Sequence, residues 1–128
     1  MNIAVICTAL LGLLLFGLGL YVSILRVRTG RNIGCDTGPV DLLHRAVRAH
    51  GNTAEYAPFF GVLFLWFAMH PAPIWVLALI VIATAARFLL VAGLLLGPRL
   101  DRPNPMRMAG ALFTYICGLT LVVKLALA

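Results

Sequence analysis

The hydrophobic residues of this chain fall into four segments, and the polar residues between them predict the fold. Residues 3–25 contain no charged side chain, and residues 74–96 contain only one, Arg87. Residues 108–128 contain a single lysine near their end, whereas the uninterrupted apolar run at 57–69 is shorter. A helix needs about 20 apolar residues to cross the hydrocarbon part of a bilayer. The first, third and fourth segments are therefore each long enough to span a membrane.

The short second segment can span a membrane only if its helix begins upstream and carries polar residues into the bilayer. The prolines of the 70–73 turn and of the segment before the fourth apolar run are typical of breaks between helices. We therefore expect an all-α, integral membrane four-helix bundle that forms a single domain over residues 1–128. Its expected helices are 2–26, 41–69, 73–97 and 105–128. The first segment lacks the charged start and cleavage site of a signal peptide, so we expect it to be retained.

The composition and the placement of charge favour a membrane over nucleic acid as the partner. Apolar residues make up 62% of the chain and charged residues 11%, against about half and a quarter in soluble domains. The net charge of +6 comes from arginines at the ends of the apolar segments. We expect the protein to lie in the cell's inner (plasma) membrane. Since basic loops stay on the cytoplasmic side, we expect both termini on the non-cytoplasmic side. The three cysteines and three histidines show no metal-ligand spacing, so we expect no metal.

Polar side chains form a stripe along the segment that precedes the second apolar run, DLLHRAVRAHGNTAEYAP at residues 41–58. Steps of four, three, four and three place five of them within roughly 80° of one another on a helix. These five are Asp41, Arg45, Arg48, Asn52 and Glu55. A solvated helix could show the same stripe. Counting about 20 residues back from Met69, however, places Asn52 and Glu55 inside the hydrocarbon, where an ionisable group needs a partner or a polar cavity.

Residues at equal distances from the turn of an antiparallel hairpin lie at one height. Glu55 and Arg87 meet this condition, so we predict that they form an ion pair or share a polar network. The same argument places Arg48 near the height of Arg107, and Arg26 ends the first helix on that side. Three helices then bring arginines to one layer. Such a layer suits a small ligand with carboxylates, which guanidinium groups bind in a bidentate manner.

Residues 45–58, RAVRAHGNTAEYAP, closely resemble the second-helix signature of the MAPEG family, the membrane-associated proteins of eicosanoid and glutathione metabolism. Residues 104–110, NPMRMAG, resemble the start of that family's fourth helix. The chain is similar to a short prokaryotic-type member over nearly its whole length. The resemblance implies a homotrimer that binds glutathione as a co-substrate between neighbouring subunits, near the cytoplasmic side. It also implies transferase or peroxidase activity on a lipophilic small molecule.

The resemblance also implies roles for individual residues. It implies a catalytic role for Arg107, which would stabilise the thiolate of glutathione. A nearby cation makes a thiol a competent nucleophile at neutral pH because it favours the charged form. The residues implied to bind glutathione are Arg26, Arg48, Asn52, Glu55 and Tyr56.

The chain departs from the family pattern at three places. Gly51 stands where one branch has an arginine, and Met108 follows Arg107 where some enzymes have a serine. The third segment lacks the tyrosine that several family enzymes place there. These departures keep open a non-catalytic lipid- or thiol-binding scaffold of the same fold. A small proton-coupled exporter with a membrane glutamate is a further alternative, although such exporters carry that glutamate in their first helix and lack a matching arginine stripe.

Overall fold

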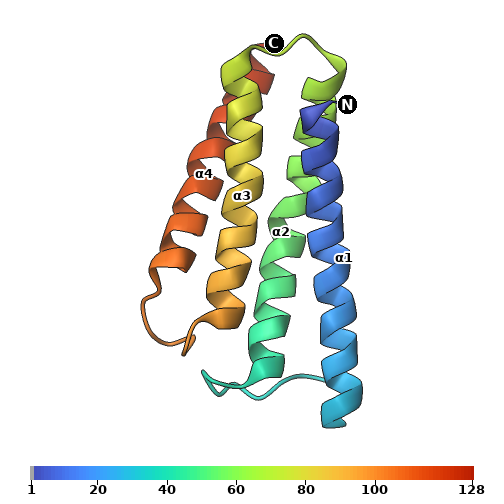
Figure 1. Cartoon of the computed structure of the whole chain (residues 1–128), viewed down its shortest axis with the longest axis vertical. Coiled ribbons are helices and arrows are strands. Elements are labelled where there is room, and N and C mark those ends of the chain that lie inside the picture. Colours follow the sequence, from blue (N-terminus) through green and yellow to red (C-terminus); the bar gives the residue numbers. More distant parts are fainter. Residues whose placement is uncertain (1) are drawn as a thin grey trace.

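The structure, a computed structural model, describes residues 2–128. Its helices are α1 (Ile3–Thr29), α2 (Leu42–Met69), α3 (Ile74–Leu96) and α4 (Pro105–Ala126), and residues 2–128 contain no strand. Consecutive helices run in opposite directions (Figure 1). The prediction of an all-α four-helix bundle is therefore confirmed.

Helix ends are set by polar side chains and by glycine. Asn2 accepts a hydrogen bond from the Ala4 amide (3.0 Å), and Asp41 accepts one from the His44 amide (2.8 Å). Each bond satisfies an amide that the first turn of a helix leaves without a partner. α1 extends to Thr29, beyond the expected end at residue 26, because the chain leaves the helix only at Gly30, whose φ of 68° is left-handed.

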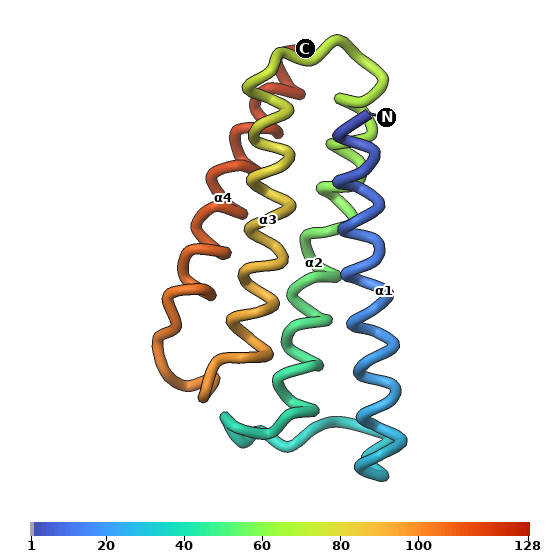
Figure 2. The backbone as a smooth tube through the Cα atoms, viewed as in Figure 1, coloured from blue at the N-terminus to red at the C-terminus, as the bar shows by residue number. Residues whose placement is uncertain are grey.

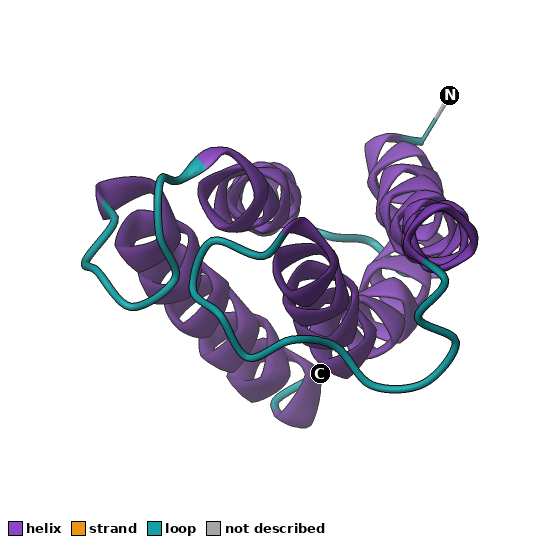
Figure 3. Ribbon diagram, turned by 90° about the horizontal axis from the view of Figure 1, so that it is seen from below, coloured by secondary structure: helices purple, strands orange, loops and turns teal. Residues whose placement is uncertain are grey.

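The four helices form two antiparallel pairs, as the backbone trace shows (Figure 2). α1 packs along α2, and α3 packs along α4, whereas α2 and α4 touch only slightly. The loops 30–41 and 97–104 lie together at one end of the bundle, which we call the basic end; Figure 3 shows the bundle from this end. The 70–73 turn and both termini lie at the opposite end, the turn end. α2 and α4 both run from the basic end to the turn end, so the seam between them joins two parallel helices.

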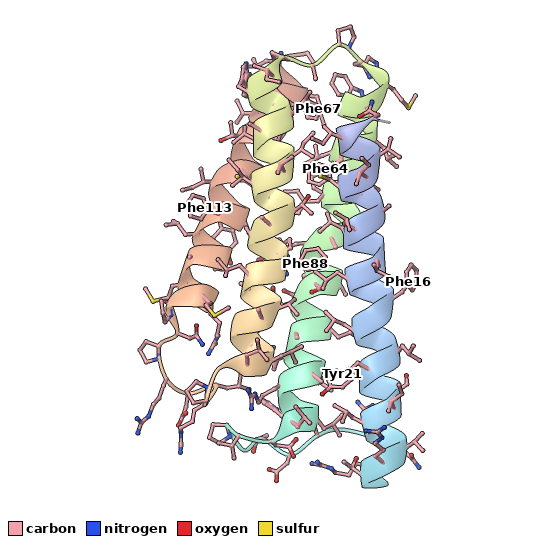
Figure 4. The ribbon with its side chains drawn as sticks, viewed as in Figure 1. Phe16, Tyr21, Phe64, Phe67, Phe88 and Phe113 are labelled. Carbon is pink, nitrogen blue, oxygen red and sulfur yellow. The ribbon has the colours of Figure 1, made fainter. Side chains whose placement is uncertain are left out.

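The apolar core is thickest towards the turn end. Phe60, Phe64 and Phe67 of α2 are buried there against Ile80 of α3 and Leu121 of α4. Figure 4 shows Phe64 and Phe67 lying between the helix pairs. The core clusters nearer the basic end are smaller, which leaves room there for polar side chains.

The outer surface of the bundle is apolar. Phe16 of α1 is 79% exposed, and Figure 4 shows it and Phe113 of α4 pointing away from the bundle on opposite flanks. α1, α3 and α4 are long and apolar enough to cross a membrane. α2 is too polar over its first half to meet the same criterion. An apolar side-chain surface suits lipid. The backbone is compatible with lipid as well, because helices satisfy their own backbone polar groups.

α3 and α4 approach closely at two glycines. A Cβ placed on Gly110 would lie 2.7 Å from the backbone nitrogen of Leu90 and 2.8 Å from the carbonyl oxygen of Ala86. A Cβ placed on Gly93 would lie 2.8 Å from the backbone nitrogen of Arg107. Small residues allow this approach, which is common between membrane helices. The contact fixes the start of α4 against the end of α3.

Replacing Gly110 with alanine should separate α3 from α4, since the added methyl group meets backbone atoms that cannot rotate away. We expect a loss of roughly 1–3 kcal/mol in the free energy of unfolding, typical of overpacking, measured by reversible unfolding in mixed detergent micelles. Gly12→Ala is the control, because no atom lies within 4 Å of a Cβ placed there. Equal stability of the two variants would contradict the close contact.

Asp41 caps α2 and also pairs with Arg31, whose Nη2 lies 2.8 Å from Oδ1 of Asp41. The hydrogen bond from Arg31, then that from the His44 amide, lowers the pKa of Asp41 below its ordinary value. A carboxyl with a lowered pKa stabilises the fold above its unfolded pKa of about 4, and this stabilisation is lost as the pH falls through the lowered value.

Asp41→Ala should therefore cost about 1 kcal/mol of unfolding free energy at neutral pH. Asp41→Asn keeps a capping oxygen and loses the charge, so it should cost less and should flatten the loss of stability in acid. Unfolding followed by circular dichroism between pH 3 and pH 7 tests both expectations. An unchanged acid profile in Asp41→Asn would show that the titration of Asp41 does not contribute to the loss of stability in acid.

Candidate functional site

A cavity of about 570 Å³ lies at the basic end between α2 and α4, against α3. We call it the basic cavity. α2 contributes polar side chains and α3 contributes two leucines, while the remaining wall comes from α4 and the loop before it. The lining side chains are His44, Arg48, Asn52, Leu90, Leu94, Leu100, Asp101, Arg102, Pro103, Asn104, Arg107, Met108 and Ala111.

The charges around the basic cavity favour an anion. Arg99 binds Asp101 with two hydrogen bonds, from Nε to Oδ1 (2.9 Å) and from Nη2 to Oδ2 (2.8 Å). These bonds lower the pKa of Asp101, which therefore stays ionised and is balanced by Arg99. Arg48, Arg102 and Arg107 then give the lining an excess of positive charge. Guanidinium groups at close range bind carboxylates through paired hydrogen bonds.

Arg107 is held at the first turn of α4 by its surroundings. Asn104 caps this turn by accepting hydrogen bonds from the amides of Met106 (2.9 Å) and Arg107 (3.4 Å). The side chain of Arg107 lies against Gly93 of α3, and its Nη1 donates to the carbonyl of Leu100 (2.8 Å). A guanidinium group has five N–H donors, so this bond leaves donors that can face the cavity.

Arg87 is buried in the interior of the bundle, with 1% of its surface exposed. Its Nη2 donates to the side-chain oxygen of Asn52 (2.6 Å) and to the Asn52 carbonyl (3.1 Å). The guanidinium carbon lies 5.1 Å from the centre of the Tyr56 ring, within the range of a cation–π interaction. Nε of Arg87 has no hydrogen-bond partner within residues 2–128.

The predicted ion pair between Glu55 and Arg87 is wrong for the described residues, whose ion pairs are Arg31–Asp41 and Arg99–Asp101. The reason is the facing of the side chains. Arg87 points from α3 towards Asn52 and Tyr56, which lie one turn apart on α2. Glu55 lies about 100° around α2 from Tyr56 and is exposed at the seam with α4. Arg87 shares a polar network with the stripe, but through Asn52.

Tyr56 meets Tyr115 of α4 across the seam. The two hydroxyl oxygens lie 3.3 Å apart, and the rings contact edge to face with centres 6.0 Å apart. Glu55 and Tyr56 line a second, smaller cavity on the turn-end side of the basic cavity. Of the residues predicted to bind a ligand, Arg48, Asn52 and Arg107 therefore share one cavity, while Glu55 and Tyr56 lie one helical turn beyond it.

Arg26 and Arg45 lie outside the basic cavity. Arg26 donates through Nη1 to two carbonyls of the α1–α2 loop, at 3.1 and 2.7 Å. Arg45 donates through Nε to the carbonyl of Leu94 (3.2 Å) and through Nη2 to the carbonyls of Leu95 and Gly97. These carbonyls end α3 and have no partner within the helix. Arg45 therefore belongs to the predicted stripe but acts as a cap for α3.

A comparison with protein-family models identifies the family. The model described as MAPEG family matches residues 4–127 of the 128-residue chain. The chain belongs to the MAPEG family. No individual curated protein and no solved structure matches it. Family membership and three helices that can cross a membrane make it an integral membrane protein.

Several residues around the site of this MAPEG protein were not predicted. Arg102 reaches the cavity from a loop, and no periodic pattern applies to a loop. Leu90 and Leu94 lie one turn apart on α3 and form the α3 side of the basic cavity. Their distance from the 70–73 turn was enough to predict their height in the bundle. Tyr115 follows Thr114, which lies on the same face of α4 as Gly110, but no pattern in the sequence shows that this side of α4 faces α2.

The hydrogen bond from Arg87 to Asn52 should be measurable as a coupling between the two positions. In a double-mutant cycle of Arg87→Met and Asn52→Ala, we expect a coupling of about 1.5–3 kcal/mol, typical of a hydrogen bond to a charged group. Unfolding in mixed micelles gives the four free energies. The cycle of Arg87→Met with Thr120→Ala, on the exposed face of α4, should be additive. Additivity at Asn52 as well would contradict the bond.

Proposed function

We propose that this MAPEG protein binds glutathione, or a similar anionic thiol, in the basic cavity and transfers the thiol to a lipophilic electrophile. The observation that carries the proposal is the lining of the cavity, where Arg48, Asn52 and Arg107 converge with Arg102. Its volume of about 570 Å³ lies within the range of roughly 300–1,000 Å³ usual for small-molecule sites. Two carboxylates of one ligand can be satisfied by arginines from two different elements.

The chemistry would rest on Arg107. A guanidinium group beside a thiol favours the thiolate, which is the attacking nucleophile. The thiolate would form a carbon–sulfur bond with the electrophile while a leaving group departs or a proton is added. Asn52 would orient the ligand, since its side-chain oxygen is occupied by Arg87 and its amide hydrogens remain free to donate. The rate gain would come from stabilising the thiolate and from holding the two reactants together.

We propose further that the chain acts as a homotrimer with its basic end on the cytoplasmic side. The arginines of both loops at this end support the orientation. Arg26 lies away from the cavity of its own chain and would contribute to a ligand held between subunits. Glu55 and Tyr56 would contact the end of the ligand nearest the turn end.

Glutathione binding and turnover test the proposal directly. Arg107→Ala should lower the rate of conjugation to a model aryl halide by roughly 10- to 100-fold, with a smaller change in KM, because the thiolate loses its cation. Arg28→Ala is the matched control, since Arg28 is exposed at the end of α1. Glu55→Ala should weaken glutathione binding measured by calorimetry.

Absence of binding by the wild-type protein at millimolar glutathione would end this proposal. A non-catalytic binding protein is the second candidate function, and one observation favours it. The α3 wall of the cavity consists of Leu90 and Leu94, so α3 places no hydroxyl group there to assist a reacting thiol. Glutathione binding without conjugation or peroxide reduction would favour this candidate.

A further inference from the structure

Within residues 2–128, Arg87 is the only charged side chain that is buried. Both of its hydrogen bonds come from Nη2 and go to Asn52, and its Nε has no partner in this part of the chain. The ion pairs of the described residues do not include it. A buried charge with an unpaired donor and no counter-ion costs free energy. Stability alone therefore does not account for this side chain.

The contact with Arg87 decides which way the amide group of Asn52 faces. A guanidinium group carries only donors, so only the oxygen of the amide can face it. The distance of 2.6 Å from Nη2 to Oδ1 is short, as is usual for hydrogen bonds from a charged donor. A partner with both a donor and an acceptor would accept either orientation of the amide. Arg87 allows one.

This orientation determines what the cavity presents to a ligand. Asn52 lines the basic cavity, and its oxygen is turned to Arg87. The other branch of the planar amide, with two N–H donors, is then the one that a ligand can meet. Arg48 and Arg107 line the same cavity, and their guanidinium groups are also donors only. These three side chains together offer donors and no free acceptor.

The contact also transmits charge to the cavity. A hydrogen bond to the oxygen of an amide polarises the group and makes its N–H a stronger donor, as in other chains of hydrogen bonds. Arg87 is not among the residues that line the basic cavity, yet its charge reaches a ligand through Asn52. The ring of Tyr56, with its centre 5.1 Å from the guanidinium carbon, holds Arg87 from another side.

We infer that Arg87 is a positioning residue for the anion bound in the basic cavity. It holds Asn52 so that the amide nitrogen faces the ligand, and it does not touch the ligand itself. The ligand group that Asn52 binds must then be a hydrogen-bond acceptor, such as a carboxylate or a peptide carbonyl, whereas an ammonium group is disfavoured. The inference rests on the proposed function only in taking the anion to be a thiol.

Two replacements of Arg87 separate positioning from packing. Arg87→Lys keeps a group with donors only, whereas Arg87→Gln supplies a donor and an acceptor and so lets the Asn52 amide reverse. The probes are glutarate, a dicarboxylate without a thiol, and glutathione, titrated by calorimetry into purified protein in lipid nanodiscs. We expect Arg87→Gln to weaken binding roughly 5- to 20-fold and Arg87→Lys by less than about 3-fold. Arg28→Gln, at an exposed position of α1, is the matched control.

Asn52→Asp provides an independent variant that stays folded. One carboxylate oxygen keeps the contact with Arg87, now as an ion pair, while the other oxygen replaces the N–H donors that face the cavity. We expect its unfolding in mixed micelles to match that of the wild type and its binding of both probes to fall at least about 10-fold. A merely structural role of the Arg87–Asn52 contact would leave binding unchanged in this variant.

Equal losses of binding in Arg87→Lys and Arg87→Gln would overturn the inference, and so would wild-type affinity in Asn52→Asp. A wild-type protein that binds neither probe would overturn it together with the proposed function. Binding of glutarate with the expected pattern, by a protein that does not bind glutathione, would support the positioning role and refute only the proposed function.

Discussion

Arg87 is a positive charge held inside a bundle whose outer surface is apolar, and the arrangement of α2 follows from it. A charge at this depth is costly unless polar groups surround it. Asn52 provides two oxygens to its Nη2, and the face of the Tyr56 ring lies beside the guanidinium group. α2 must therefore turn its polar face towards α3 and towards the seam with α4. The smaller apolar core towards the basic end is the result.

The tight packing within the helix pairs determines where the cavities lie. Gly93 and Gly110 bring α3 and α4 so close that no space for a cavity remains between the helices at these positions. α2 and α4 have no such contact, and the seam between them holds both cavities. The same glycine contact positions Arg107 on the first turn of α4, at the edge of the basic cavity. A packing constraint between two apolar helices thus orients a charged side chain on one of them.

The sequence was sufficient to predict the four helices, the polar stripe and the shared height of Arg48 and Arg107, because these depend on run lengths and helical periodicity. It was insufficient for the partner of Arg87. The distance from the 70–73 turn fixes the height of Arg87 in the bundle. The rotation of α2 about its own axis decides whether Arg87 faces Asn52 or Glu55. Arg45 shows the same limit, since its place in the stripe does not reveal that it caps α3. The contact between Tyr115 and Tyr56 could not be predicted either, because the packing of α4 against α2 cannot be deduced from either helix alone.

The walls of the two cavities differ in the phase they meet. The basic cavity lies at the loop end of the bundle, and the second, smaller cavity between α2 and α4 is bordered by exposed apolar side chains such as Phe59 and Leu119. Binding in the basic cavity would depend on the concentration of the ligand in water. Binding in the second cavity would depend on the mole fraction of the ligand in the bilayer. Adding lipid at constant protein would dilute a lipid-soluble ligand and leave the concentration of a water-soluble ligand unchanged. Occupancy of the seam would then depend on the amount of membrane as well as on affinity.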